Sequence, residues 1–380
     1  MPIRFGVRPK SVARRVHDAY TRALSIFRIP LRKQRFSEAS GVDDLGEVQA
    51  AGESLLDNGL ESAFYGSEQR FVRRTWPGGH LYRVRNAAVV GDNGHIFLSD
   101  GTLLTTASNE YSEPDRKIRR PIRLGAARMD GPLFHLTGVA HGNRAHFVLQ
   151  LLLGLLAAKP SLEQRPEMRV LVANKHRSWQ FGYLDRLGIH PERVIENSAG
   201  TVLASELYYV PPLFGPDQLG VPSAYEQLRA AWPEGSRPEP KSVLFVSRRD
   251  APGRRLLNEE EIVRTTCEVL GPVDCVALAG LPLDEQVTRF QSARWIIGPH
   301  GQGLSNAVFS PRSLLVDLSA GVTLPGEAQW ETTYRNMTLM QRGRAVRLVS
   351  GLPNLGNADW HFPAERYRDQ LKKLARLCQQ

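Results

Sequence analysis

The sequence predicts an α/β protein built from two domains. Its 380 residues exceed what one core usually takes and suffice for two domains of ordinary size. Short apolar, β-branched runs alternate with helix-like segments along residues 133–232 and again along residues 242–380. This alternation is typical of parallel sheets with right-handed crossovers. Residues 233–241 hold three prolines and a glycine, so we predict a linker there.

Composition excludes several classes of protein. Hydrophobic residues at 42% and charged residues at 23% are typical of a globular chain. The longest apolar run, residues 147–158, is interrupted by polar Gln150 and falls short of the roughly 20 residues that span a bilayer. No signal peptide is predicted. The three cysteines, Cys267, Cys275 and Cys378, lack metal-ligand spacing. We therefore expect a cytoplasmic protein without a metal site.

The amino-terminal arm, residues 1–35, carries most of the net charge of +10. It holds ten Lys or Arg against one acid, Asp18, whereas the remaining chain has 39 basic and 38 acidic residues. Because the folded body is nearly neutral, we expect no nucleic-acid partner. Apolar residues recur in the arm at helical spacing, which favours a helix on an anionic membrane surface at the inner face. Packing on the body, or a solvated arm, is the equal alternative.

Residues 36–132 are predicted to be an amino-terminal extension. A short helix is expected near residues 53–64. Residues 81–90 and 95–98 read as two strands joined by a turn at residues 91–94, which gives a small β meander. The acidic residues of this region form no Asp-x-Asp, the metal-binding motif of one class of sugar transferases.

The first α/β domain, residues 133–232, begins with a strand at 133–139. A loop then feeds a helix from His146 to Lys159, which we expect Pro160 to close. Asn143 is placed to cap that helix, and His146 lies in its first turn at the carboxyl end of the strand. Strands at 169–173, 193–195 and 202–210 and helices at 179–187 and 225–232 are expected to follow.

The second α/β domain, residues 242–380, begins with a strand whose carboxyl end delivers Ser247, Arg248 and Arg249, with Arg255 shortly after. Planar guanidinium groups bind diphosphate oxygens well, although such a cluster is often only a solvated loop. A capping box at Asn258 is predicted to start the next helix. Further strands are expected at 273–278, 295–297, 314–318 and 344–349, and the last helix, 364–378, is expected to pack across the domain junction.

The glycine-rich stretch 298–311 follows the strand at 295–297 and leads into a short apolar helix. Gly301 and Gly303 allow close approaches that a Cβ would block, and the first helical turn leaves N–H groups unpaired. Such a turn suits an anion, most often a phosphate. His300 lies at the carboxyl end of the strand, where open α/β sheets bind ligands. An ordinary strand-to-helix turn is the competing interpretation.

Four ordered blocks carry a resemblance to a known family. They are Asn143-x-x-His146, residues 246–259, residues 285–293, and the stretch 298–309 with its Gly-Pro-His-Gly-x-Gly-Leu-x-Asn wording. Together they resemble glycosyltransferase family 61. The resemblance implies a GT-B fold, in which two Rossmann-like domains face a cleft, an inverting mechanism and a nucleotide-sugar donor.

The resemblance also implies donor-site residues: His300, Gly301, Gln302, Gly303, Leu304 and Asn306, beside Ser247, Arg248, Arg249 and Arg255. Asp317 stands where the family usually has Glu, and a ribose contact is implied there. Phe147 and Gln150 depart from the Trp and the acid that are typical after the histidine. Because position 150 holds Gln, the catalytic role that the family's acid would have there is not assigned to this chain.

The sequence thus predicts an inverting, metal-independent glycosyltransferase without cofactor. A nucleotide-diphosphate sugar, chiefly a UDP-sugar, would be the donor and a glycan the acceptor, in surface or capsular polysaccharide synthesis. His146 is the preferred general base and His141 the second candidate, with Asn143 on the acceptor side. A Rossmann oxidoreductase is disfavoured because no Gly-x-Gly-x-x-Gly opens either sheet. A non-catalytic nucleotide-binding or scaffold protein of the same fold stays open.

Overall fold

The computed structural model describes residues 31–105, 118, 120–121, 125–138, 141–173, 178–214, 219–233, 242–321, 332–352 and 358–379. Most of the arm and of the linker lies outside these residues. The chain divides into two compact units: unit 1 is Met1–Gly52 with Trp76–Phe214, and unit 2 is Glu53–Thr75 with Gly215–Gln380. Both units therefore differ from the predicted domains, because each is assembled from two separate stretches of chain.

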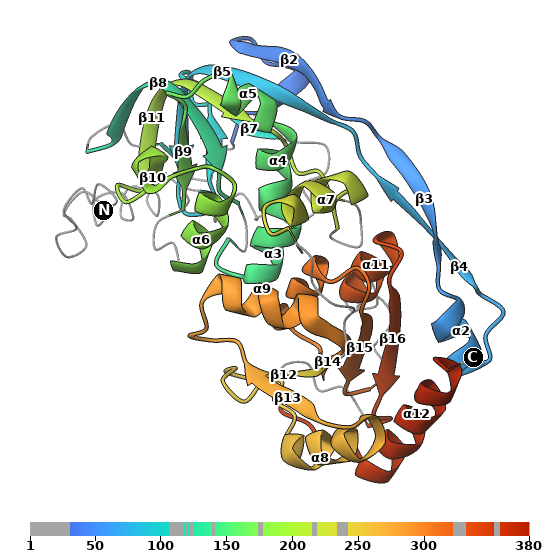
Figure 1. Ribbon diagram of the computed structural model, residues 1–380. Helices are drawn as coiled ribbons and strands as arrows, with labels where there is room; N and C mark the ends of the chain where they lie inside the picture. The colour runs from blue at the N-terminus through green and yellow to red at the C-terminus, as the bar shows by residue number, and fades with distance from the viewer. Residues whose placement is uncertain are drawn as a thin grey trace. The chain divides into compact units, whose positions relative to one another are not determined.

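Unit 1 is organised on a nine-stranded sheet (Figure 1). Its main path runs β1-β7-β6-β5-β11-β8-β9-β10, and β2 pairs with β5. The strands are β1 (Lys33–Arg35), β2 (Val42–Gln49), β5 (Gly79–Val90), β6 (His95–Phe97), β7 (Leu103–Thr105), β8 (Ala127–Leu136), β9 (Arg169–Val172), β10 (Val194–Glu196) and β11 (Thr201–Tyr209).

The β meander is part of this sheet and not a separate extension. Strands β5 and β6 pair antiparallel where the sequence predicted two strands and a turn. Strand β5 also pairs antiparallel with β11 from Thr201↔Val90 to Tyr209↔Tyr82. Strands β8, β9, β10 and β11 are parallel to their neighbours among themselves. The sheet is therefore mixed. The apolar face of the meander is buried in the same core as the parallel strands, which explains why the two parts belong to one sheet.

The long helix of unit 1 is built from four short pieces. They are α3 (Arg144–His146), the π-helix η3 (Phe147–Leu151), α4 (Leu152–Ala157) and α5 (Lys159–Glu163). The expectation that Pro160 closes the helix is wrong. Pro160 lies in the first turn of α5, where the N–H that proline lacks has no helical partner anyway. Helix α6 (Ser178–Arg186) and the 3₁₀ turn η4 (Pro191–Arg193) connect the next strands.

Unit 2 is organised on a five-stranded, wholly parallel sheet of order β13-β12-β14-β15-β16 (Figure 1). The three inner strands are almost fully buried, as parallel strands covered on both faces must be, whereas the edge strands β13 and β16 are partly exposed. The strands are β12 (Ser242–Ser247), β13 (Val273–Ala277), β14 (Ala293–Pro299), β15 (Leu314–Ser319) and β16 (Arg344–Val349). The alternation that the sequence predicted for this region is confirmed strand by strand.

Helices cover both faces of the unit 2 sheet. Helices α8 (Glu259–Leu270) and α12 (Ala364–Leu377) pack together on one face, and α9 (Leu283–Ser292) and α11 (Thr333–Met340) lie on the other (Figure 1). The 3₁₀ helix η5 (Gln302–Phe309) follows β14, and α7 (Pro222–Ala230) contacts η5. Helix α12 packs on α8 and on α2 (Gly59–Tyr65), both in unit 2, so the contacts seen for it are not those expected at a domain junction.

The capping box predicted at Asn258 is not formed. The Asn258 side chain makes no cap hydrogen bond to α8. It donates to Glu261 Oε2 at 2.9 Å and to Phe362 O at 2.8 Å, and accepts from Phe362 N at 3.1 Å. A segment distant in sequence therefore outcompetes the local cap, because it satisfies both ends of the amide.

Residues 53–75 belong to unit 2 because a buried carboxylate anchors them there. Strands β3 (Gly52–Asp57) and β4 (Phe71–Trp76) form a two-stranded ribbon that leads to α2, where one helix was predicted. Glu61 accepts from Arg335 Nη1 at 2.7 Å and from Arg347 N at 3.0 Å. Phe64 joins the apolar core of unit 2. The ribbon thus carries α2 to the edge strand β16, far from it in sequence. Local periodicity does not reveal this contact.

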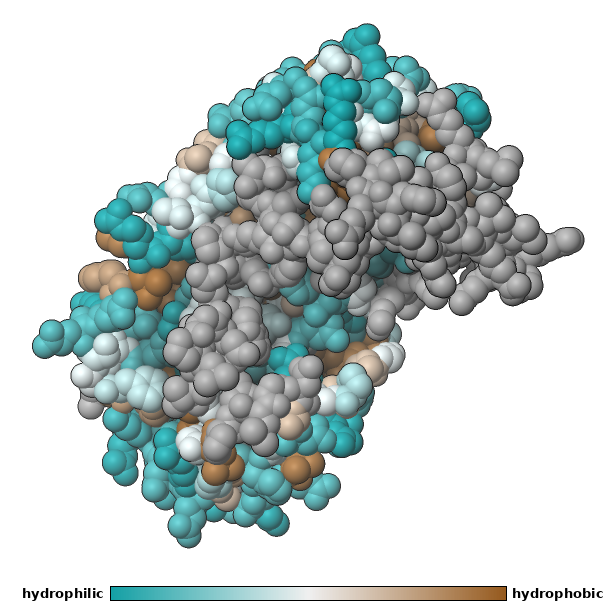
Figure 2. All heavy atoms as spheres, turned by 180° about the vertical axis from the view of Figure 1, so that it is seen from behind, coloured by the Kyte–Doolittle hydropathy of each residue, from teal (hydrophilic) through white to brown (hydrophobic). Residues whose placement is uncertain are grey.

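The described surface carries only scattered apolar side chains. Six large ones are exposed, among them Leu55, Phe71 and Leu257. On the face drawn in Figure 2, hydrophobic residues of the described part form small spots separated by hydrophilic ones. No helix within the described ranges is long and apolar enough to cross a bilayer. The proposed contact of the arm with a membrane concerns residues 1–35, of which only 31–35 are described.

Candidate active site

The order in which successive strands are added to the unit 2 sheet reverses between β12 and β14. Strand β12 comes first in the chain, β13 lies on one side of it, and β14, β15 and β16 follow on the other. This is the 2-1-3-4-5 order of a doubly wound sheet, whose ligand site lies at the carboxyl ends of the two strands that flank the reversal. Here those ends deliver Arg248 after β12 and His300 after β14.

Gly301 and Arg248 meet at this point of reversal. A Cβ atom on Gly301 would lie 1.6 Å from Nη1 of Arg248, so the guanidinium occupies the space that any other residue would fill. Gly301 has an extended backbone, with φ 170°, and glycine is needed there for the close approach and not for its conformation. The structure therefore brings together two residues that lie 53 positions apart and that the sequence assigned to one donor site.

The Arg248 guanidinium is a partly buried charge. Burial lowers the pKa of Arg248, and the charge of Arg254 lowers it further. Nη2 donates to Gly253 O at 3.0 Å, whereas Nε is buried without a hydrogen-bond partner among the described residues. A buried guanidinium remains charged, and an N–H without a partner is costly. Both features favour an anion beside it.

Glu259 fixes the loop that carries Arg248. Its Oε1 accepts from Ser247 Oγ at 2.5 Å, and its Oε2 accepts from the backbone N–H of Arg248 at 3.1 Å. Ser247 Oγ in turn accepts from Arg249 N at 3.2 Å. The side chain of Ser247 thus shapes the loop, and Arg249 is exposed. Ser247 is buried more deeply than the half-buried Arg248, but its hydroxyl is engaged within the loop.

Arg255 and Arg254 have different surroundings. Arg255 donates to Asp359 through its backbone N at 2.8 Å, Nε at 2.9 Å and Nη2 at 2.6 Å. The carboxylate raises the pKa of Arg255, whose side chain is 48% exposed. Arg254 has a left-handed backbone, with φ 55°, and its charge acts on Arg248 and Tyr334. Arg254, which belongs to the same sequence block as Arg255 but was not assigned to the donor site, is therefore the second arginine near Arg248.

His300 forms an ion-pair contact with Asp317. Its Nδ1 lies 2.8 Å from Asp317 Oδ2, and the two side chains are 13% and 2% exposed. The His300 ring packs on Tyr334, with centroids 4.9 Å apart. Burial, and secondarily the charge of Asp317, raises the pKa of Tyr334, so it stays a neutral phenol. Asp317 thus contacts His300, where the resemblance implied a ribose.

The remaining residues of the glycine-rich stretch build the scaffold. Leu304 is fully buried, and a Cβ on Gly303 would lie 3.1 Å from Val246 Cγ1. Asn306 is also fully buried and donates from Nδ2 to Gln286 Oε1 at 3.0 Å, which ties η5 to α9. Gln302 is exposed at the start of η5. Of this group, only Gln302 has a side chain at the surface.

In unit 1, His146 pairs with the residue that replaces the family's acid. Its Nδ1 lies 2.9 Å from Gln150 Oε1. An amide oxygen only accepts, so Nδ1 carries the hydrogen and Nε2 the lone pair. Burial lowers the pKa of His146, an effect that the Gln150 hydrogen bond opposes in part. The ring is therefore neutral at pH 7, as a general base must be.

A π-helix begins immediately after His146. Residues Phe147–Leu151 form η3, and Phe147, Val148, Leu149 and Gln150 are buried. Such insertions are frequent at functional sites, since they change which face the following side chains occupy. Here Gln150 is buried at four positions from His146. The spacing of four residues also makes neighbours on an ordinary α-helix, so the pairing itself does not depend on the π-helix.

His141 and Asn143 lie in the loop before α3. His141 Nδ1 lies 3.1 Å from Gly138 O, and the His141 carbonyl accepts from Gln180 Nε2 at 2.7 Å. Asn143 caps α3, because its Oδ1 accepts from Ala145 N at 2.9 Å. Asn143 therefore has the predicted capping role, and both histidines present a hydrogen-bonded Nδ1.

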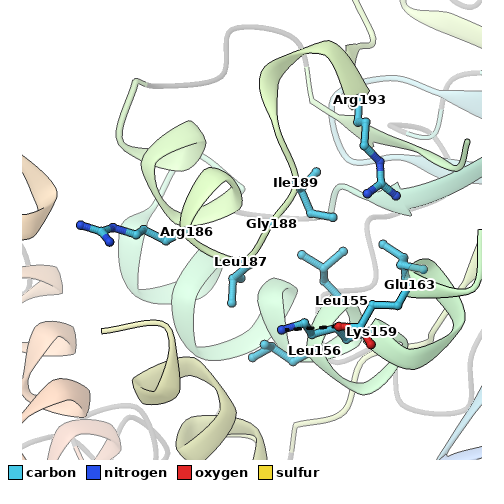
Figure 3. Close-up of a pocket in the computed structure, with 10 residues that line it drawn as sticks. Leu155, Leu156, Lys159, Glu163, Arg186, Leu187, Gly188, Ile189 and Arg193 are labelled. Carbon is cyan, nitrogen blue, oxygen red and sulfur yellow. Dashed lines mark ion pairs between the residues drawn. The ribbon is translucent and has the colours of Figure 1, made fainter. Parts of the chain in front are cut away.

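A cavity of about 320 Å³ in unit 1 contains none of the predicted residues. It lies between α4, α5 and the turn after α6 (Figure 3). Leu155, Leu156 and Ile189 line it and are buried, while Lys159 and Glu163 pair at 3.8 Å at its edge. The Arg186 side chain points away from the others in this view. Nothing here suggests more than a hollow left by packing.

Across the described ranges, no group of three or more His, Cys, Asp or Glu side chains is arranged to hold a metal ion. The residues that the sequence prediction missed, Arg254, Tyr334 and Asp359, carry no spacing signal. Arg254 and Arg255 are adjacent and identical in type. Only the positive φ of Arg254 and the position of Asp359, 104 residues further on, separate their roles.

Comparison with protein families gives one match. Residues 132–316 match the family described as Glycosyltransferase 61. The matched region contains His141 and His146 of unit 1 and Arg248 and His300 of unit 2, and it ends one residue before Asp317. No curated protein matches the chain.

Proposed function

Because the chain belongs to glycosyltransferase family 61 and is a glycosyltransferase, we propose that it transfers a sugar from a nucleoside-diphosphate donor, a UDP-sugar, to a glycan hydroxyl with inversion. We further propose that the two units act as the halves of a GT-B enzyme, unit 2 binding the donor and unit 1 the acceptor. The product would enter a surface or capsular polysaccharide.

One observation carries the donor assignment: the partly buried Arg248 guanidinium lies against the Gly301 backbone at the point where the strand order of the unit 2 sheet reverses. A diphosphate needs positive charge and N–H donors in a place from which water is largely excluded. Arg248 supplies both, and Arg254 adds a second charge near it. The site therefore suits the group that leaves in the transfer.

The reaction balances without a further reactant. The acceptor oxygen forms a bond to the anomeric carbon while the bond from that carbon to the diphosphate oxygen breaks. The electron pair leaves with the nucleoside diphosphate, and the acceptor proton passes to a base. His146 fits the base, since it is neutral and its Nδ1 is held by Gln150, which directs the lone pair to Nε2. His141 is the second candidate.

We propose that the transfer needs no divalent metal and no cofactor. Leaving-group charge can be stabilised by arginines and backbone N–H groups as well as by a metal ion. Arg248 and Arg254 supply two such charges, so their removal should affect donor binding more than a chelator does. The enzyme would act in the cytoplasm, with residues 1–35 holding it on an anionic membrane face.

The test is binding of UDP by calorimetry, followed by mass spectrometry of products from a nucleotide-sugar library. Wild type should bind UDP equally with and without excess EDTA, and Arg248→Ala should weaken binding about 10- to 100-fold, as for a charge-assisted hydrogen bond. Arg264→Ala removes an exposed arginine from α8 and serves as the control. Unchanged UDP binding by Arg248→Ala would place the donor elsewhere. Loss of binding in EDTA, restored by Mg²⁺ or Mn²⁺, would refute metal independence.

A further inference from the structure

Asp317 and His300 are brought together by two adjacent parallel strands. The register of β14 and β15 pairs Gly298 with Asp317 and Pro299 with Leu318. His300 continues this ladder, because its N–H donates to Leu318 O at 2.8 Å. The backbone therefore places the His300 ring beside the Asp317 carboxyl, with Nδ1 and Oδ2 2.8 Å apart. The pairing follows from the register of the sheet and not from loop geometry.

Asp317 is buried too deeply to serve a ligand directly. The residue is 1% exposed, and its Oδ1 has no hydrogen-bond partner among the described residues. A buried carboxylate is stabilised only by groups that touch it, and here the His300 ring is such a group. A ribose hydroxyl would have to reach past that ring. The observations thus favour an action of Asp317 through His300.

The contact also fixes which ring nitrogen carries a hydrogen. A carboxylate has no hydrogen to give, so it is the acceptor in such a pair. Nδ1 of His300 then donates to Asp317, and Nε2 lies on the opposite edge of the ring. Tyr334 packs on the ring face with the two planes at 45° and restricts its rotation. The contact with Asp317 and the packing of Tyr334 together fix the direction in which Nε2 points.

The next residue after His300 is Gly301, against which the Arg248 guanidinium lies. The His300 ring thus stands beside the arginine site at the end of β14. Tyr334 links the two, since its hydroxyl is within electrostatic reach of Asp317, Arg248 and Arg254. An anion held by Arg248 would have the His300 ring as a neighbour.

We propose that Asp317 is a positioning residue: it accepts from Nδ1–H of His300 and balances the charge of a protonated ring, so that Nε2–H donates to the diphosphate of the nucleotide bound at Arg248. The inference rests on the proposed function, because it takes the ligand to be a nucleoside diphosphate. A purely structural role, in which the pair only ties β15 to the turn after β14, predicts different results.

The experiment is a double-mutant cycle with UDP as the probe, measured by calorimetry. His300→Gln removes the ring, and Asp317→Asn keeps the shape of the side chain but loses its charge. Each is expected to weaken UDP binding about tenfold. Asp317→Asn made in the His300→Gln background should add nothing, because the ring through which Asp317 acts is gone. Asp274→Asn, on β13 of the same sheet, is the matched control and should bind UDP normally.

A second measurement is made on the wild type, and the His300→Gln variant is used only to assign the signal. In protein labelled with ¹⁵N-histidine, the spectrum of His300, assigned by its loss in His300→Gln, should show a hydrogen on Nδ1 and, with UDP bound, a hydrogen on Nε2 as well. A hydrogen on Nε2 alone would overturn the proposal. So would normal UDP binding by Asp317→Asn, or a further loss in the His300→Gln background. If wild type binds neither UDP nor pyrophosphate, the donor assignment itself is wrong. If wild type binds UDP but the variants behave otherwise than expected, only the positioning role of Asp317 is wrong.

Discussion

The proposed donor side in unit 2 and the proposed acceptor side in unit 1 hold their key groups by different means. In unit 2, charged side chains are fixed by close backbone approaches, as where Arg248 fills the space beside Gly301. In unit 1, a neutral pair, His146 and Gln150, sits at a π-helical insertion. A leaving diphosphate demands charge, whereas a general base must stay uncharged until it takes a proton. The difference between the sites follows from these two demands.

The largest expected effect separates turnover from donor binding. His146→Ala should lower kcat about 100-fold or more, as expected when a general base is lost. UDP binding should stay within about twofold of wild type, since the donor is assigned to unit 2. Calorimetry and initial rates with the donor found in the library screen measure both quantities.

His141→Ala is the matched control for that variant. If it lowers kcat while His146→Ala does not, the base is His141. If neither variant loses turnover, the base comes from another residue or from the substrate, and the comparison between a charged and a neutral site no longer holds.

The next effect concerns the glycine that receives Arg248. Gly301→Ala should displace the guanidinium, because the added Cβ would lie 1.6 Å from Nη1. We expect UDP binding about tenfold or more weaker, with little further loss when Arg248→Ala is added. Gly142→Ala in unit 1, where a Cβ meets nothing within 4 Å, should bind UDP as wild type does. Full additivity of Gly301→Ala and Arg248→Ala would show that the two act separately.

A comparable effect is expected from the neutral partner of His146. Gln150→Leu removes the acceptor of Nδ1–H and should lower kcat about tenfold, as for a lost buried hydrogen bond. Burial lowers the pKa of His146 below its usual value, so the acidic limb of the kcat profile should lie below about 6.5.

Gln150→Glu would place a negative charge beside the ring and favour its protonated form. The acidic limb should then move to higher pH, because the base is lost to protonation earlier as the pH falls. A limb that stays in place would mean that His146 is not the group whose protonation limits turnover. UDP binding serves as the control, since Gln150 belongs to unit 1 and the donor is assigned to unit 2.

The smallest effect distinguishes two adjacent arginines. Arg255→Ala should leave UDP binding within about twofold, because Asp359 already engages its guanidinium. Arg254→Ala should weaken binding more, roughly fivefold to tenfold, since it lies near Arg248. Calorimetric titration of the two variants with UDP compares them directly. The reverse ranking would return the donor role to Arg255, as the sequence had suggested.

Much of unit 2 could be predicted from the sequence because its strands are continuous apolar runs separated by turns. Each predicted strand from 242 to 349 has a counterpart in the sheet. Unit 1 was less predictable. The apolar segment after His146 hides a π-helix, and Pro160 starts a helix where it was expected to end one. Local periodicity cannot distinguish these outcomes, since the same residues suit either.

The sequence by itself determined the α/β class, the meander, the family and the two histidines and Arg248 as candidates. These depend on periodicity, turn residues and ordered motifs, which are local properties. Tertiary structure alone decided that residues 53–75 join unit 2, that Asp317 contacts His300, and that Asp359 engages Arg255 while Arg254 lies near Arg248. These outcomes depend on strand register and on partners as far as 286 residues apart in sequence, as for Glu61 and Arg347. A linear pattern does not record which distant groups will meet, because that choice is made by the packing of the whole core.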